Sequence, residues 1–173
     1  DDSFFRPTPV SPKDLCKVFN PQYVQQLLTG NLDAKAMRRI GFPWSAQLIQ
    51  RSLTAVGGTV LSAELALEHG KALNLTGGYH HAFANYGSGF CLFNDLYLAA
   101  LTRLKSPKID KVLIFDCDVH QGDGTAKLAE NHTQIYTVSI HAEKNFPYRK
   151  QHSDMDFNLL KGTQDSEDRK SVV

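Results

Sequence analysis

Three carboxylates and one imidazole are concentrated in the nine-residue stretch Asp116-Cys-Asp-Val-His-Gln-Gly-Asp-Gly124. This stretch directly follows the apolar run Lys111–Phe115, which is typical of a buried strand. In an open α/β sheet the carboxyl ends of the strands form the crevice in which ligands bind. Asp118 and His120 are two positions apart, so both side chains can face one bound ion. The spacing therefore predicts a metal site at the end of a strand.

A second group of chemically active residues lies upstream, in Thr76-Gly-Gly-Tyr-His-His-Ala82. Adjacent side chains of an extended backbone point in different directions, so His80 and His81 can have different partners and different protonation states. That arrangement suits a general base beside an electrostatic neighbour. An isolated Asp-x-His is weak evidence for metal binding, but the strand before it and the histidine pair agree with it. The histidines without such neighbours are interpreted as solvated or structural; they are His69, His132 and His152.

The elements that must position these groups alternate between helical and extended patterns. This alternation predicts an α/β fold with a parallel, doubly wound sheet. Paired glycines, Gly57-Gly58, lie inside the longest predicted helix and indicate either the close approach of another backbone or a kink. Helices are expected at 11–28 (two, broken at Asn20-Pro21), 33–40, 45–69, 94–104 and 125–130, and strands at 71–75, 111–115 and 134–140.

The composition is that of an intracellular globular protein, and the cytoplasm is the expected location. Hydrophobic residues make up 42% and charged residues 21%, with a formal net charge of +1 and no long block of one sign. We therefore expect no direct binding to nucleic acid or to a membrane. The three cysteines, Cys16, Cys91 and Cys117, are too few and too widely spaced for a disulfide framework. Cys91 and Cys117 are expected to pack as small apolar residues.

Three ordered motifs together resemble the zinc-dependent histone deacetylase superfamily. They are Gly77-Gly-Tyr-His-His81, Gly87-Ser-Gly-Phe-Cys-Leu-Phe-Asn-Asp95 and Asp116–Gly124. Gln121 stands where the best-known members often repeat histidine, which resembles the class IV branch and its bacterial relatives. The resemblance assigns residues 1–165 to part of the catalytic domain. Residues 166–173 form a polar tail, and its last six residues are hypothesised to be translated adapter rather than native sequence.

The resemblance implies an arginase-like fold with one catalytic zinc ion and one structural potassium ion. Asp118 and His120 match zinc ligands, and a second aspartate is expected from a later strand. Zinc with three protein ligands keeps an open position that polarises an amide and activates water. The potassium site is matched, partly through backbone carbonyls, by Asp116, Asp118, His120, Ser139 and Ile140.

The same resemblance pairs His80 with Asp116 and His81 with Asp123, beside the metal-bound water. We interpret His81 as the general base and His80 as an electrostatic and orienting neighbour.

A narrow tunnel for the acylated side chain is also implied. Gly89 and Phe90 match one wall and Phe146 the opposite one, and residues 42–44 are expected near the mouth. The expected substrate is acetylated protein lysine, an acetylpolyamine or a related acylated amine.

The third zinc ligand, a glycine-rich tunnel segment and the oxyanion tyrosine of the superfamily have no match before Val173. Losing one oxyanion donor costs about 10² to 10³ in rate, so we expect this chain to be inactive by itself. Missing strands would also expose sheet edges and apolar faces.

Two other functions stay open from the residues. A dimanganese ureohydrolase of the arginase or agmatinase type would favour an Asp-x-His-x-Asp order, whereas Asp116-x-Asp118-x-His120 favours one zinc ion. A non-catalytic module that binds acyl-lysine or acylpolyamine would use the same tunnel without hydrolysis.

Overall fold

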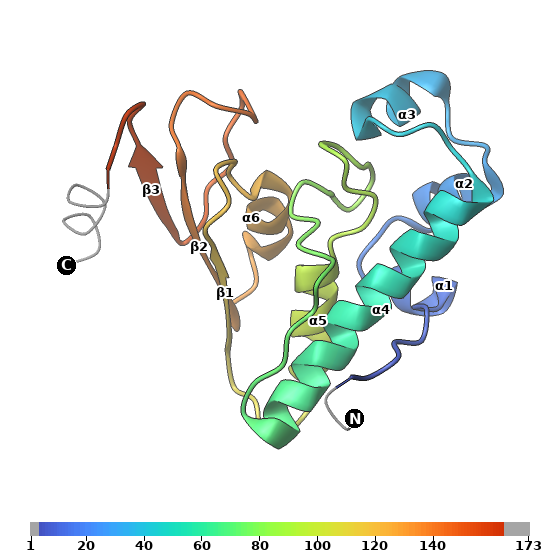
Figure 1. Cartoon of the computed structure of the whole chain (residues 1–173), viewed down its shortest axis with the longest axis horizontal. Coiled ribbons are helices and arrows are strands. Elements are labelled where there is room, and N and C mark those ends of the chain that lie inside the picture. The colour runs from blue at the N-terminus through green and yellow to red at the C-terminus, as the bar shows by residue number, and fades with distance from the viewer. Residues whose placement is uncertain (1–3, 165–173) are drawn as a thin grey trace.

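The computed structural model describes residues 4–164, and in it a group of helices precedes a parallel sheet (Figure 1). The predicted polar tail, 166–173, lies outside the described residues. The helices are α1 (Pro12–Leu15), α2 (Pro21–Thr29), α3 (Ala34–Ile40), α4 (Ala46–His69), α5 (Asp95–Arg103) and α6 (Asp123–Ala129). The strands are β1 (Val112–Asp116), β2 (Ile135–Ala142) and β3 (Met155–Leu159).

Local sequence explains where most helices begin and end. Five N-cap side chains accept hydrogen bonds from backbone N–H groups of the first turn, which would otherwise lack partners. Three helices end at glycines with positive φ, a conformation that costs glycine little. The N-caps are Ser11, Asn20, Asp33, Ser45 and Asn94, and the terminating glycines are Gly30, Gly41 and Gly70.

Helix α4 runs without interruption through Gly57-Gly58. A Cβ atom at Gly57 would lie 2.0 Å from the backbone oxygen of Thr8, so the glycine allows the N-terminal segment to cross the helix. The close-approach interpretation of these glycines is therefore confirmed, and the kink is not seen. None of the helices within 4–164 is both long and apolar enough to cross a membrane.

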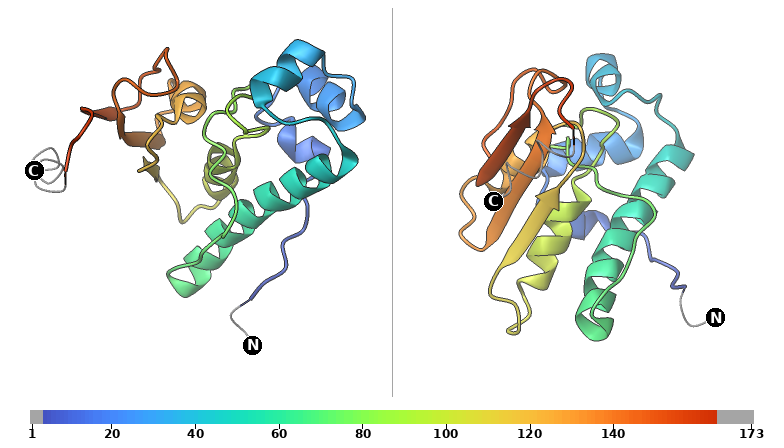
Figure 2. Two further views of the ribbon diagram at one scale, coloured as in Figure 1. Left: turned by 45° about the horizontal axis from the view of Figure 1, so that its top comes forward. Right: turned by 60° about the vertical axis from the view of Figure 1, so that its left-hand side comes forward.

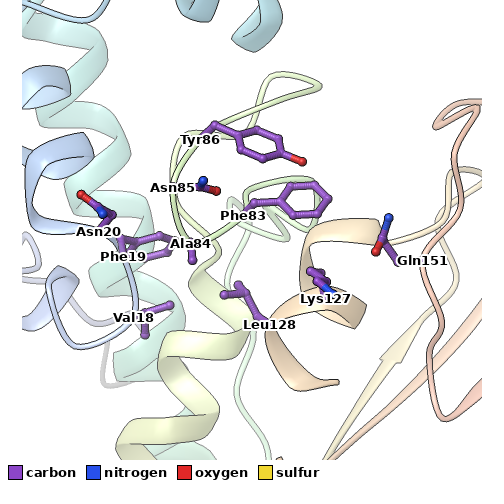
Figure 3. A pocket seen from close by; sticks show the side chains of 10 residues that line it. All are labelled: Val18, Phe19, Asn20, Phe83, Ala84, Asn85, Tyr86, Lys127, Leu128 and Gln151. Carbon is purple, nitrogen blue, oxygen red and sulfur yellow. The ribbon is translucent and has the colours of Figure 1, made fainter. Parts of the chain in front are cut away.

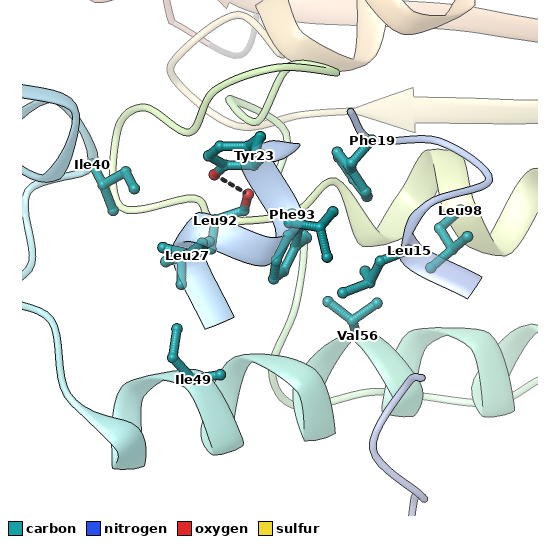
Figure 4. Close-up of a cluster of buried hydrophobic side chains, with 11 residues drawn as sticks. Leu15, Phe19, Tyr23, Leu27, Ile40, Ile49, Val56, Leu92, Phe93 and Leu98 are labelled. Atoms are coloured by element: carbon teal, nitrogen blue, oxygen red, sulfur yellow. Dashed lines mark hydrogen bonds between the residues drawn. The ribbon is translucent and has the colours of Figure 1, made fainter. Parts of the chain in front are cut away.

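Two apolar clusters hold the helices and the sheet. The larger one lies among the N-terminal helices, where the Tyr23 hydroxyl donates to the carbonyl of Leu92 at 2.8 Å (Figure 4). The smaller one joins α5 and α6 to the sheet through Tyr97, Ala129 and Ile135. The segment that carries the paired histidines is hydrogen-bonded to both helices of the sheet side, to α5 through Asp95 and to α6 through Thr125.

The sheet has the order β1-β2-β3 and all of its strands are parallel, as the sequence predicts. Register places Asp116, Ser139 and Asp156 in one row across the three strands. Helices α5 and α6 cover one face, and the opposite face is open in the right-hand view of Figure 2. Large side chains on that face are exposed, among them Leu113, Phe115, Tyr136 and Met155. The exposed apolar face that the sequence predicts is thus present.

The predicted strand at 71–75 is wrong. This segment has no strand assignment, and Leu73 and Leu75 are 90% and 94% exposed. Asn74 attaches it to α4 instead, because its side-chain amide donates to the carbonyl of Ala55 and the hydroxyl of Thr59. A strand requires a hydrogen-bonded neighbour, and no strand within 4–164 pairs with this segment.

Candidate active site

The acidic loop after β1 is shaped by its own aspartates. The Asp116 carboxylate accepts a hydrogen bond from the N–H of Asp118 at 2.9 Å. Asp118 does the same for the N–H of His120 at 2.8 Å. Side-chain oxygens that bond to the backbone two residues ahead make consecutive turns. The Asp-x-Asp-x-His spacing therefore fixes the conformation of the loop through side-chain hydrogen bonds to its own backbone.

His80 is buried beside this loop and paired with Asp116. Its Nδ1 lies 2.6 Å from Asp116 Oδ2, and since a carboxylate only accepts, the imidazole is the donor. Burial works against the charged imidazole, but the hydrogen bond to Asp116 and the charges of Asp116, Asp118 and Asp123 outweigh it and raise the pKa of His80. The pairing with Asp116 therefore favours the charged form of the His80 imidazole.

His81 forms a second buried pair, with Asp123 at the start of α6. Its Nδ1 donates to Asp123 Oδ1 at 2.7 Å, and the same carboxylate accepts from the N–H of Gly124 at 3.0 Å. The rings of His80 and His81 have centroids 4.0 Å apart. Because each Nδ1 is used by a carboxylate, Nε2 is the nitrogen that each ring can offer to a substrate or water. The two pairings that the family resemblance implied are confirmed.

Asp118 and His120 form a third, more exposed pair. Asp118 Oδ1 and His120 Nδ1 are 3.0 Å apart, with side chains 49% and 37% exposed. Two ligand atoms of a tetrahedral zinc ion lie about 3.3 Å apart, so the pair fits one ion with little movement. Burial would raise the pKa of Asp118, but the hydrogen bond from the N–H of His120 and the nearby imidazoles lower it, which keeps the carboxylate ionised.

Residues 4–164 contain no group of three or more His, Cys, Asp or Glu side chains that could hold a metal ion. Within this range Asp118 and His120 lie together as the pair that the sequence predicts to bind zinc, and zinc binding at this pair stays a prediction.

The structure brings part of the potential potassium set together. Asp116 and Ser139 are register neighbours on β1 and β2, and Ile140 follows Ser139. The Ser139 hydroxyl is hydrogen-bonded to Nδ1 of His141 at 3.0 Å. The potassium assignment stays a prediction.

The predicted tunnel residues are only partly assembled. Phe146 lies edge-on to His81, with ring centroids 4.9 Å apart, and 6.0 Å from the His120 ring. A Cβ atom on Gly89 would lie 2.7 Å from the His81 ring and 3.1 Å from that of Phe146. Gly89, Phe146 and His81 are therefore in close contact, and only glycine fits at position 89.

Phe90 is placed differently from its neighbour. It is exposed, and its ring packs against Phe42 with centroids 5.1 Å apart. This contact joins Phe90 to the 42–44 segment, which the sequence placed near the mouth of the tunnel. A direct role of Phe90 in substrate binding stays a prediction.

Three residues make contacts in the site that the sequence did not predict, although Gln121 was noted as a departure from the usual motif. Asp95 accepts hydrogen bonds from the N–H groups of Gly78 and Tyr79, directly before His80. Gln121 is fully buried, and its side chain donates a hydrogen bond to the loop before β3. Lys150 belongs to that loop and donates to one of its backbone carbonyls. An aspartate at the start of a helix pattern was the available signal for Asp95. Gln121 and Lys150 carry no local signal, because their partners are distant in sequence or are backbone atoms.

Two remaining predictions concern cysteines and isolated histidines. Cys91 is buried as expected, but Cys117 is exposed, so its prediction is wrong. Cys117 lies one residue after β1, in a stretch whose alternate side chains face the open side of the sheet. His69 and His152 are exposed, in agreement with their interpretation as solvated residues, and His132 packs edge-on against Tyr97.

A separate surface pocket lies away from the acidic loop. It is lined by the 18–20 segment, the 83–86 loop, α6 and Gln151 (Figure 3). The Phe83 and Tyr86 rings are stacked there with centroids 4.5 Å apart.

Comparison with known proteins defines the class to which this fold and site belong. A family model described as "Histone deacetylase domain" matches residues 1–166. The chain therefore belongs to the histone deacetylase domain family. The fold agrees, because an HDAC homolog from Aquifex aeolicus superposes with a TM-score of 0.78 at 23% identity, over 96% of this chain and 50% of that one.

The relatives of this chain include a bacterial and a plant protein. An uncharacterized protein of Picosynechococcus is 53% identical over 148 residues, which is 86% of this chain and 49% of the relative. Histone deacetylase 2 of Arabidopsis thaliana is 38% identical over 93 residues, which is 54% of this chain and 24% of the relative. The chain thus spans half or less of the length of these relatives.

Proposed function

We propose that the protein is a zinc-dependent deacylase that hydrolyses the amide of acetyl-lysine or of a related acylated amine. Family membership supports this function. The observation that carries it is geometric: two buried imidazole–carboxylate pairs lie beside Asp118 and His120, whose ligand atoms are 3.0 Å apart. Carboxylates paired with buried histidines at the end of a strand are an arrangement that is common at functional sites.

Asp118 and His120 would hold the zinc ion, together with a ligand from outside residues 4–164. A bound zinc ion supplies Lewis-acid polarisation of the acyl carbonyl and a more acidic water. His81 would act as the general base through Nε2, since its Nδ1 is paired with the Asp123 carboxylate and Nε2 is the ring nitrogen left to take up a proton. The proton is then available for the departing amine.

His80 has a different role in this proposal. Asp116 orients it and favours its charged form, so it stabilises negative charge at the reacting centre rather than removing a proton. Removing Asp116 would release both the orientation and the charge. This division between the adjacent histidines follows from their different carboxylate neighbourhoods.

Phe146 and Gly89 would enclose the aliphatic stem of the substrate, with Phe90 at the outer wall. A side chain at position 89 would collide with the His81 ring and crowd the Phe146 ring, so glycine is what allows these groups to pack together. A narrow apolar passage favours a slender acylated amine. Acetylated protein lysine and acetylpolyamines are the proposed substrate classes, a structural potassium ion is proposed beneath the zinc site, and the proposed location is intracellular.

The test uses the full-length gene product, assayed with an Nε-acetyl-lysine peptide and with an acetylated polyamine. We expect hydrolysis that is lost on chelation with EDTA, restored by zinc and absent in His81→Ala. Restoration by manganese with release of urea from a guanidino substrate would indicate a ureohydrolase instead. Binding of the acetylated probe without turnover would indicate a binding module.

The 173-residue chain alone is expected to show no turnover with zinc, because two side-chain ligands hold the ion weakly. Multiple turnovers by the purified chain would contradict the assignment of a third ligand outside residues 4–164.

A further inference from the structure

Gln121 follows His120 directly, and only 1% of its surface is exposed. Its side-chain Nε2 donates to the carbonyl of Gln151 at 2.8 Å and to Asp156 Oδ1 at 2.8 Å. Its Oε1 accepts from the N–H of Gln151 at 2.9 Å. The amide thus pairs with one backbone residue as a neighbouring strand would, and it also bonds to a carboxylate. These partners fix the orientation of the amide, because exchange of its O and N would place like groups together.

The partners of Gln121 lie in the loop between β2 and β3 and on β3 itself. Gln151 lies near the end of this loop, with its side chain lining the separate pocket of Figure 3, so Gln121 uses its backbone alone. Asp156 lies on β3, and its other oxygen accepts from the N–H of Ser153 at 3.0 Å. Gln121, which follows the proposed zinc ligand His120, therefore anchors the end of this loop and the start of β3 through its buried side chain.

The same loop carries Phe146. Lys150, next to Gln151, donates through Nζ to the carbonyls of Asn145 and Pro147, at 2.6 and 2.8 Å. These carbonyls lie on either side of Phe146. A continuous chain of contacts therefore runs from Gln121 through the backbone of Gln151 and the ammonium group of Lys150 to the residues that flank the ring.

We propose that Gln121 is a positioning residue that acts through the 145–151 loop to hold Phe146 against His81 and His120. This inference rests on the proposed function for its effect on catalysis, but not for its effect on the loop. Three hydrogen bonds to a fully buried amide make it a more rigid anchor than a surface contact. Position 121 thereby couples the width of the substrate passage to the metal-binding loop.

The first test is structural and does not require activity. Gln121→Leu removes all three bonds at similar size, and Gln50→Leu, on the exposed side of α4, is the matched control. We expect amide hydrogen exchange in residues 145–151 of the full-length gene product to rise about tenfold in Gln121→Leu, with exchange in β2 within about threefold of wild type. Exchange in this loop equal to that of the control would overturn the proposal.

The second variant, Lys150→Met, guards against general loss of folding in the first. Lys150 is only partly buried, and its removal leaves the bonds of Gln121 intact. We expect the same loop to loosen, again by about tenfold, while thermal unfolding shifts little. If neither variant changes the exchange of residues 145–151, the contact chain does not hold Phe146 and the proposal is wrong.

The third test asks whether the effect passes through Phe146. For an acetyl-lysine peptide we expect Gln121→Leu to raise KM about tenfold and to change kcat less than about threefold, whereas partial unfolding would lower kcat alone. In a Phe146→Ala background the change in KM should disappear. An undiminished KM effect in that background would refute the route through Phe146. If the wild-type protein has no deacylase activity, the proposed function fails, and the exchange experiment alone decides the role of Gln121.

Discussion

Asp95 offers the sharpest test of how the fold holds the paired histidines. It is fully buried at the first residue of α5, and its carboxylate accepts from the N–H of Gly78 at 3.0 Å and the N–H of Tyr79 at 2.7 Å. The Thr59 hydroxyl donates to the same carboxylate. Tyr79 immediately precedes His80, so this single side chain fixes the backbone that leads into the paired histidines. We predict that Asp95→Ala destabilises the protein and loosens residues 77–79.

The magnitude follows from opposing terms. Three donors lose their acceptor, each at about 1–3 kcal/mol when left without a partner. Removing the carboxylate also removes the cost of burying it, which offsets part of this loss of stability. That cost is visible in the pKa of Asp95, which burial raises despite the hydrogen bonds from Thr59 and the two amides. The net expected loss is about 2–4 kcal/mol for Asp95→Ala. Asp95→Asn should lose about 1–3 kcal/mol, since its amide keeps one acceptor but places N–H groups against donors.

The assay is urea unfolding of the full-length gene product, with amide exchange at Gly78 and Tyr79. Asp110→Ala is the control, because Asp110 is exposed. The pKa of Asp95 in the folded protein lies above its ordinary value of 3.8, so the folded state binds the proton of this carboxyl more tightly than the unfolded state does. The contribution of Asp95 to wild-type stability therefore rises as the pH falls from the folded pKa toward 3.8. The deficit of Asp95→Asn should therefore be larger near the acidic end of this window. A loss within about 0.5 kcal/mol of the Asp110 control would refute the reasoning.

Three further outcomes are expected. Asp123→Asn should lower kcat about 10²- to 10⁴-fold with little change in KM, because His81 loses both its orientation and a charged acceptor. If bound zinc falls by the same factor as kcat, the substitution has disrupted the metal site instead. Gly57→Ala should lower the urea midpoint, with a loss of about 1–3 kcal/mol in the free energy of unfolding, because the added Cβ would collide with the Thr8 carbonyl. Alanine favours helices more than glycine does, so a higher midpoint would contradict that contact. Cys117 should react with a disulfide reagent in the native state, whereas Cys91 should not, since burial raises its pKa to about 12; rapid labelling of Cys91 would disagree.

Much of the fold was predictable because its signals are local. Caps and terminating glycines mark the helices, and the bounds expected for α4 match those observed, from the Ser45 cap to Gly70. Strand β3 was not predicted, although Met155, Phe157 and Leu159 alternate with polar residues. The segment 71–75 has the apolar composition of a strand but no paired neighbour in the described chain. A strand is decided by its partners, and composition alone does not supply them.

The site shows the same division between local and distant information. Motif spacing, with the family resemblance, was sufficient to predict the pairs His80–Asp116 and His81–Asp123. The contacts of Gln121 were not predictable, because a glutamine beside a motif reads as part of the motif until its partners, 30 and 35 residues away, are known. Side chains that act directly leave a pattern in the sequence, whereas those that hold them in place leave little.

The two halves of the site differ in how far the described residues complete them. The imidazole–carboxylate pairs are largely buried and are bonded within residues 4–164, whereas the side chains of Asp118 and His120 are more exposed. They follow β1, which among the described strands is hydrogen-bonded only to β2. Zinc affinity should therefore depend on groups outside this range far more than the histidine pairs do. Two measurements test this, each made on the 173-residue chain and on the full-length gene product: the affinity for zinc, and amide hydrogen exchange at His80 and His81. For the 173-residue chain we expect weak zinc binding but slow amide exchange at the two histidines. Tight zinc binding by this chain would show that Asp118 and His120 suffice.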